Sequence, residues 1–266
     1  MFEIKKMEDA DYFGIGCADI FKPKELVVSN SWLKKVFNQG LYDILIAPDE
    51  VIDDDLQKTF NVGSGFHCFC LEREEFDKRY YIAEVNDPID DRVRIAPADF
   101  NFIKKVHKNI SMKYPEILDG EDTELVILGE IDGVKTKSKL DKIVMYADGK
   151  VDIIDLKSVH YNFMEMKKGI DGTQYKLRRE ITDMDYDLQA YFYTMQVKKW
   201  LSAKNRDSTR VSFSLLLASK NTHDVKMYRM GDEIMESGRM KFESVWGDVV
   251  NFVKHGDSSI DRFDVL

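Results

Sequence analysis

The sequence predicts an α/β fold of the α+β kind, in which a mixed central sheet contains an antiparallel meander and is flanked by helices. Asp-Gly pairs at 119–120, 132–133 and 148–149 separate stretches that suit strands. Asp-Gly favours a tight two-residue turn because it tolerates a positive φ, so the strands that it joins pair side by side. Apolar residues at helical spacing on either side of this region predict the flanking helices.

In the first third of the chain, serines mark the expected helix starts. Ser29 or Ser31 can cap one short helix, and Ser64 can cap the helix that carries His67. The acidic run at 53–55 lies between these two helices. We interpret it as a solvated loop or a helix start rather than as a metal site.

The rest of the chain supplies elements that are recognised by apolar periodicity and by the residues that begin them. Pro97 suits the first turn of a helix, and Asp183 or Asp185 can begin another. The expected elements are strands at 80–85 and 211–218 and helices at 98–114, about 185–203 and 242–254.

Length and composition limit the class of protein. The chain of 266 residues is long enough for one α/β core, and we expect residues 1–266 to form a single domain. The absence of a run of about 18 apolar residues or an apolar leader argues against a membrane or secreted protein and favours the cytoplasm. Cys17, Cys68 and Cys70 fit a reducing compartment and cannot supply the four thiolates of an iron–sulfur cluster.

The hairpin around 148–149 carries the most specific chemistry. Side chains alternate along a strand, so Asp155 and Lys157 share one face, and Asp141 lies on the preceding strand. Two converging carboxylates can hold a divalent cation such as Mg²⁺, and a lysine beside them can position a water or neutralise developing charge. This arrangement suits phosphodiester hydrolysis. The alternative is a solvated strand face on which either aspartate pairs with a neighbouring lysine.

The hairpin resembles the D…(D/E)-x-K core of the PD-(D/E)XK nuclease superfamily, and other segments resemble its RecE-like and lambda-exonuclease-like (exonuclease VIII-type) branch. The resemblance covers roughly residues 28–197 and implies a restriction-endonuclease-like core. The further segments, in the order of that branch, are VSNSWLKKVF (28–37), GSGFHCFCLEREEF (63–76), HKNISMKYPEILDGEDTELVI (107–127) and YDLQAYFYTM (186–195).

The resemblance implies a metal site. Asp141 and Asp155, with the main-chain carbonyl of Leu156 and help from His67 and Glu124, would bind one or two Mg²⁺ ions, with Mn²⁺ as a substitute. Without this context, a histidine beside phenylalanines is ordinarily a core or surface residue.

The resemblance also implies roles for three further side chains. Lys157 would orient the attacking water or offset charge in the transition state. Gln189 and Tyr193 lie four residues apart, on one helix face. The amide would orient the lysine or a phosphate, and the phenol would contact the DNA backbone. The pair could instead be a polar stripe.

Basic residues near the hairpin are candidates for DNA contacts. The formal net charge of −9 opposes general attraction to phosphates, but a groove depends on local charge. Lys135, Lys137 and Lys139 share one face of the strand that leads into the hairpin, and Arg178 and Arg179 are adjacent in YKLRRE. We expect these five side chains to bind DNA.

The family resembled degrades one strand of duplex DNA from an end, mostly 5′ to 3′. Its product serves a single-strand annealing protein in phage-type recombination, and its members form ring-shaped homo-oligomers. A phage-encoded member would act in the host cytoplasm. Alternatives remain open: a single-strand-specific exonuclease, a structure-specific endonuclease, a non-catalytic DNA-binding or assembly subunit that retains the fold, and an unrelated acidic interaction protein.

Overall fold

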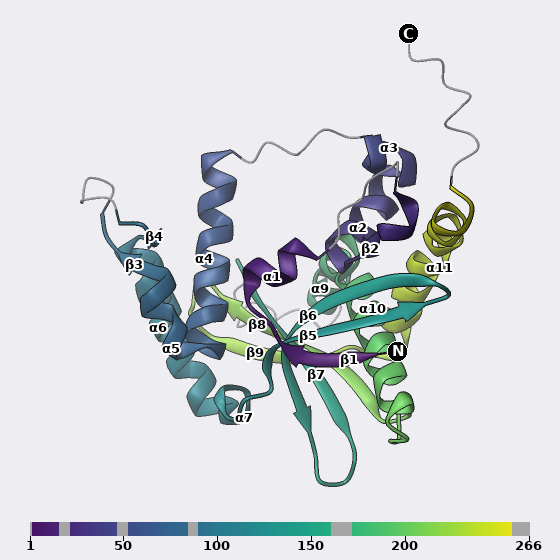
Figure 1. Ribbon diagram of the computed structural model, residues 1–266. Coiled ribbons are helices and arrows are strands. Elements are labelled where there is room, and N and C mark those ends of the chain that lie inside the picture. The colour runs from purple at the N-terminus through teal and green to yellow at the C-terminus, as the bar shows by residue number, and fades with distance from the viewer. Residues whose placement is uncertain (1, 16–21, 47–52, 85–89, 161–171, 257–266) are drawn as a thin grey trace.

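A mixed sheet runs through the middle of the molecule, with helices on both of its faces (Figure 1). The structure, a computed structural model, describes residues 2–15, 22–46, 53–84, 90–160 and 172–256. In these ranges seven strands form the sheet, in the order β1-β5-β6-β7-β8-β9 with β2 beside β6. The strands are β1 (Glu3–Lys6), β2 (Val27–Val28), β5 (Thr123–Ile131), β6 (Val134–Met145), β7 (Val151–Val159), β8 (Val211–Ser219) and β9 (Val225–Arg229); β3 (Tyr80–Ile82) and β4 (Val93–Ile95) form a separate parallel pair.

The predicted meander is confirmed, since β5, β6 and β7 pair antiparallel in sequence order. Asp132 and Gly133 join β5 to β6 in a two-residue turn, with φ of 52° and 88°. The turn after β6 is longer than the predicted two residues. In the Asp148-Gly149 pair, only Gly149 has a positive φ. The Asp148 carboxylate accepts a hydrogen bond from the Lys150 N–H (3.1 Å). That side-chain bond stabilises a wider loop.

The sheet forks in its middle, and this fork positions the candidate site. Registered pairs between β6 and β7 end at Lys142 and Ile154, whereas β7 continues beside β8, in parallel, as far as Val159. On its other side, β6 remains paired with β5. The β6–β7 hairpin therefore opens next to Asp141 and Asp155.

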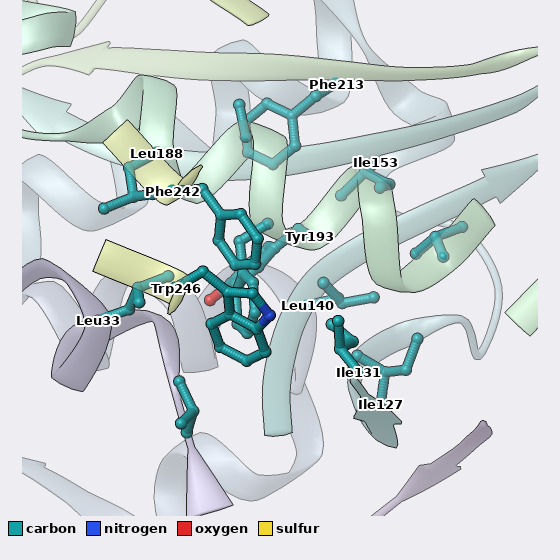
Figure 2. Close-up of a cluster of buried hydrophobic side chains, with 14 of the residues drawn as sticks. Leu33, Ile127, Ile131, Leu140, Ile153, Leu188, Tyr193, Phe213, Phe242 and Trp246 are labelled. Atoms are coloured by element: carbon teal, nitrogen blue, oxygen red, sulfur yellow. The ribbon is translucent and has the colours of Figure 1, made fainter. Parts of the chain in front are cut away.

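Two helical layers bury the two faces of the sheet. One core packs helices against residues such as Ile153 and Phe213, and Figure 2 shows part of this cluster, with Tyr193 inside it. The other core contains Ile154 and Leu156, which face the opposite way, as strand alternation predicts. The first layer comprises α2 (Asn30–Gln39), α3 (Leu41–Ile46), α9 (Gly172–Asp183), α10 (Tyr186–Ala203) and α11 (Asp232–His255); the second comprises α4 (Asp54–Leu71), α5 (Arg73–Arg79), α6 (Pro97–Lys113) and α7 (Pro115–Leu118).

Helix starts were predicted with mixed success. Ser29 caps α2 by accepting the Trp32 N–H (3.3 Å), as expected. The prediction that Ser64 caps the helix of His67 is wrong, because α4 begins much earlier. Its cap is the Asp53 carboxylate, which accepts the Leu56 N–H at 2.7 Å. The acidic run lies at the positive end of the helix dipole, where such a cap contributes about 1 kcal/mol.

Other boundaries also differ from those expected. The last helix begins at Asp232 instead of near 242, and the strand expected at 80–85 ends at Ile82. Cys68 and Cys70 are buried, and Cys17 lies outside the described residues. Within the described ranges, no helix is both long enough and apolar enough to cross a bilayer. The single domain over residues 1–266 stays a prediction.

Candidate active site

The fork brings His67 of α4 against two carboxylates of the sheet. Its Nδ1 lies 3.3 Å from Asp141 Oδ2 and 3.9 Å from Glu124 Oε1. On the other side of the ring, Nε2 lies 2.9 Å from the carbonyl oxygen of Leu156. These residues line a pocket of about 600 Å³, which also contains Lys157. The structure therefore brings together four of the five predicted metal-site residues, all except Asp155, from α4, β5, β6 and β7.

Local backbone irregularity directs the carboxylates into this pocket. Glu124 and Asp141 are skipped in the register of β5 and β6, which pairs Thr123 with Lys142 and then Leu125 with Leu140. Glu124 has a φ of 51°, in the left-handed region that non-glycine residues rarely adopt. Such strain costs on the order of 1–3 kcal/mol and is concentrated at functional sites. Asp141 Oδ2 accepts the Leu156 N–H (2.7 Å), which satisfies an amide next to the opening of the hairpin.

Asp155 lies on the face of β7 opposite to Ile154 and Leu156, and a residue of α10 holds its carboxylate. Its Oδ2 is 2.6 Å from Lys157 Nζ, and its Oδ1 accepts the amide of Gln189 at 2.7 Å. Tyr193 lies one helical turn further along α10. Its ring is buried in the core between the sheet and α10, and the contact of its phenol with DNA stays a prediction. Of the two residues predicted to share a helix face, Gln189 is therefore the one that supports Asp155.

A second buried network fixes the start of α10, one turn from Gln189. Lys241 of α11 donates to Asp185 (2.7 Å) and Asp187 (2.9 Å), and Ser237 donates to Asp187 (2.6 Å). Asp185 has a φ of 52° and precedes the first residue of the helix, as one of the two predicted starts. Because both carboxylates are buried, this network holds α10 in one position relative to β7.

The charges in the site perturb one another strongly. Burial alone lowers the pKa of His67, but the carboxylates of Asp141 and Glu124 outweigh burial and raise it to about 9. Burial and the Asp141 charge raise the pKa of Glu124 to about 7. Burial opposes ionisation of Asp141, yet His67 holds its pKa below the usual range. Burial raises the pKa of Asp155. A proton on His67 thus offsets a surplus of carboxylate charge.

The donor set fits a hard divalent cation. His67, Glu124 and Asp141 each offer a ligand atom, and the three atoms lie within 4.8 Å of one another. Carboxylate oxygens with one imidazole nitrogen suit Mg²⁺ or Mn²⁺. Asp155 is not in this group, since its oxygens contact Gln189 and Lys157. Its role as a ligand, and that of the Leu156 carbonyl, stay predictions.

The three lysines of β6 do share a face, but α1 (Asp9–Gly14) covers part of it. Lys137 Nζ donates to the carbonyls of Tyr12 (2.8 Å) and Ile15 (2.7 Å). Lys139 Nζ lies 2.6 Å from carboxylates of both Asp9 and Glu124. Lys135 is exposed. Two of the three ammonium groups are therefore held by acceptors of the protein itself.

Arg178 and Arg179 lie on the exposed surface of α9. Arg178 pairs with Glu233 (2.6 Å) and lines a different pocket, beside Tyr228. Arg179 pairs with Asp183 (3.3 Å). Neither arginine lines the pocket of His67. Their DNA contacts stay a prediction.

Lys34 and Tyr186 are neighbours of the site that the sequence did not single out for it. Lys34 Nζ lies 5.0 Å and Lys157 Nζ 5.4 Å from the centroid of the Tyr186 ring, and Lys34 donates to the Met184 carbonyl (3.0 Å). Burial, and then the charge of Lys157, lower the pKa of Lys34 to about 8. Lys34 lies within VSNSWLKKVF, but helical spacing alone does not show which of its lysines faces the site.

Comparisons with known proteins agree with the fold. A family model described as a PDDEXK-like domain of unknown function (DUF3799) matches residues 31–261. A solved structure from Eubacterium rectale, provisionally named as an exonuclease, is 15% identical over 96% of this chain and 89% of that chain, with a TM-score of 0.59. At 15% identity, this structural similarity shows that the two proteins share a fold and shows nothing further. A second solved structure, SSO0001, is 14% identical over 84% of this chain and 92% of that chain, with a TM-score of 0.24. No curated protein gives a significant match.

Proposed function

The chain belongs to the family of PDDEXK-like domains, and from this premise we propose that it is a metal-dependent deoxyribonuclease that degrades DNA from its ends. Family membership and the mixed, helix-flanked sheet confirm the PD-(D/E)XK resemblance and the fold class that the sequence predicted. The proposal of an exonuclease draws further support from the name carried by the Eubacterium rectale protein.

One observation carries the proposal: the opening of the β6–β7 hairpin places His67, Glu124 and Asp141 around one point, with the Asp155–Lys157 pair on the adjoining strand. His67, Glu124 and Asp141 would hold the cation, with Asp155 completing the site. A bound divalent cation supplies charge stabilisation at the phosphate and lowers the pKa of a bound water.

Lys157 acts in this scheme as a fixed positive charge rather than as a base. Burial opposes its charge, but Asp155 and Asp141 outweigh burial and raise the pKa of its ammonium above the ordinary value. It therefore keeps its protons at neutral pH. The ammonium can donate to the attacking water or to a phosphate oxygen, while Gln189 keeps the Asp155 carboxylate in place.

The finer features of the proposal follow from the resemblance to the RecE-like branch. They are digestion of duplex ends in the 5′ to 3′ direction, Mg²⁺ as the cation, a homo-oligomeric assembly, and a single-strand annealing partner in phage-type recombination. A non-catalytic subunit of the same fold is disfavoured because Asp141, Asp155 and Lys157 are all present.

The decisive experiment compares linear and covalently closed circular duplex DNA, each with Mg²⁺ or with EDTA, and blocks the 5′ and 3′ ends in turn. We expect Mg²⁺-dependent loss of linear DNA and survival of circles. Asp155→Asn should abolish the activity. Asp152→Asn is the matched control, since Asp152 lies on the same strand but pairs with Lys150 (2.6 Å).

Other results would redirect the proposal. Nicking of closed circles by the homogeneous protein would indicate an endonuclease. A folded protein that binds DNA but cleaves neither form, with Mg²⁺ or Mn²⁺, would indicate a non-catalytic subunit.

A further inference from the structure

Two phenylalanine side chains stand exposed where the active-site pocket opens. Phe13 of α1 is 72% exposed and Phe60 of α4 is 49% exposed. Both line the pocket that contains His67, Asp141 and Lys157. One exposed apolar ring is ordinary, but two rings from separate elements that flank the same pocket indicate a contact surface.

The face of α4 leads from Phe60 directly to the candidate metal ligand. Phe60 and His67 are seven residues apart, so they lie on one face about 10 Å apart along the helix. Gly63 and Ser64 line the pocket between them, and a Cβ added to Gly63 would meet nothing within 4 Å. The helix surface between Phe60 and His67 is therefore open, and its length of about 10 Å matches about three stacked nucleotides at roughly 3.4 Å each.

The cations that line this pocket are already engaged by carboxylates. Arg79 pairs with Asp9 (3.1 Å) and Glu72 (3.2 Å). Lys139 pairs with Asp9 as well, and Lys157 pairs with Asp155. Among the lining residues that the structure describes, each lysine and arginine is therefore neutralised within the protein. Phosphates along the entrance therefore gain little from these cations, whereas the faces of nucleobases can stack on the exposed rings of Phe13 and Phe60.

We propose that Phe13 and Phe60 form a base-stacking entrance, through which the substrate strand reaches the active site unpaired. This inference rests on the proposed nuclease function and specifies the form of its substrate. The rings of a base pair inside a duplex are covered by their neighbours, so the terminal nucleotides must be separated from their complement before they enter. Frayed ends and single-stranded overhangs are then preferred over blunt ends.

The test measures binding without cleavage. Fluorescence anisotropy in EDTA compares oligothymidylate of about 12 nucleotides with an abasic oligomer of the same length and charge. Wild type should bind the abasic oligomer more weakly. Phe13→Ala and Phe60→Ala should each weaken binding of oligothymidylate roughly tenfold and leave the abasic affinity unchanged, whereas Phe60→Trp should retain binding. Tyr42→Ala is the control, since Tyr42 is 48% exposed on α3 and does not line the pocket.

Several outcomes would overturn the proposal. They are equal binding of both oligomers by wild type, unchanged affinity in folded Phe13→Ala and Phe60→Ala proteins, or a loss that extends equally to the abasic oligomer. A change in sedimentation that appears only in these two variants would instead assign the rings to contact between copies of the chain. Because no cleavage is required, failure of the nuclease proposal appears separately, as base-dependent binding without digestion of linear DNA.

Discussion

The ion pair between Lys157 and Asp155 allows a quantitative test of the site. Its atoms are 2.6 Å apart, and the two side chains are only 22% and 3% exposed. At an effective dielectric constant of about 20, the attraction at this distance is about 6 kcal/mol. The lost hydration of both groups offsets much of it, but removal of one partner from a buried pair typically costs about 3–5 kcal/mol. Lys157→Met should therefore lower the free energy of unfolding of the metal-free protein by about that amount.

Removal of both charges should cost much less than removal of one. In Asp155→Asn with Lys157→Met, no uncompensated charge is buried, and the amide of residue 155 can still accept the hydrogen bond from Gln189. We expect the double variant to unfold within about 1–2 kcal/mol of wild type. Each single variant should be less stable than the double variant, and all three should lack nuclease activity.

Urea denaturation in EDTA at neutral pH, followed by circular dichroism, measures these differences. Lys78→Met is the control, since Lys78 and Glu75 are also 2.6 Å apart but are 67% and 37% exposed, and its effect on the free energy of unfolding should be small beside that of Lys157→Met. Additive effects of the two single substitutions, or a loss under about 1 kcal/mol for Lys157→Met, would refute the reasoning.

Two other predictions concern protons and salt. Because His67 and Glu124 have pKa values of about 9 and about 7 and must both lose their protons to bind a metal, calorimetry should show Mn²⁺ affinity rising with pH. The rise should reach about a hundredfold per unit below pH 7 and about tenfold per unit between pH 7 and 9, and it should level off above about 9. An affinity that does not change with pH would exclude the imidazole as a ligand. Lys135→Gln should reduce the salt dependence of DNA binding: the slope of the logarithm of the binding constant against the logarithm of the salt concentration should become shallower by about one. Lys139→Gln should instead destabilise the fold by about 3 kcal/mol, because it leaves the buried Glu124 with only the more distant His67 imidazole, 3.9 Å away, and equal behaviour of the two variants in both assays would contradict this contrast.

The sequence by itself determined the features that depend on neighbouring residues. Alternation placed Asp155 and Lys157 on one face of a strand, and Asp-Gly turns arranged three strands into a meander, because both effects act over a few residues. Helical spacing likewise placed Gln189 and Tyr193 on one face. The order of these short segments was enough for the PD-(D/E)XK resemblance that the family match confirms.

Only the tertiary structure decided which of these groups meet and which charges remain free. His67 and Leu156 are 89 residues apart, and Lys139 and Asp9 are 130 apart, so no local rule relates them. The lysines of β6 looked like a basic surface because the sequence does not show that α1 packs over them. Whether an ammonium group attracts phosphate depends on whether a carboxylate already neutralises it, and the folded chain supplies those carboxylates from distant segments.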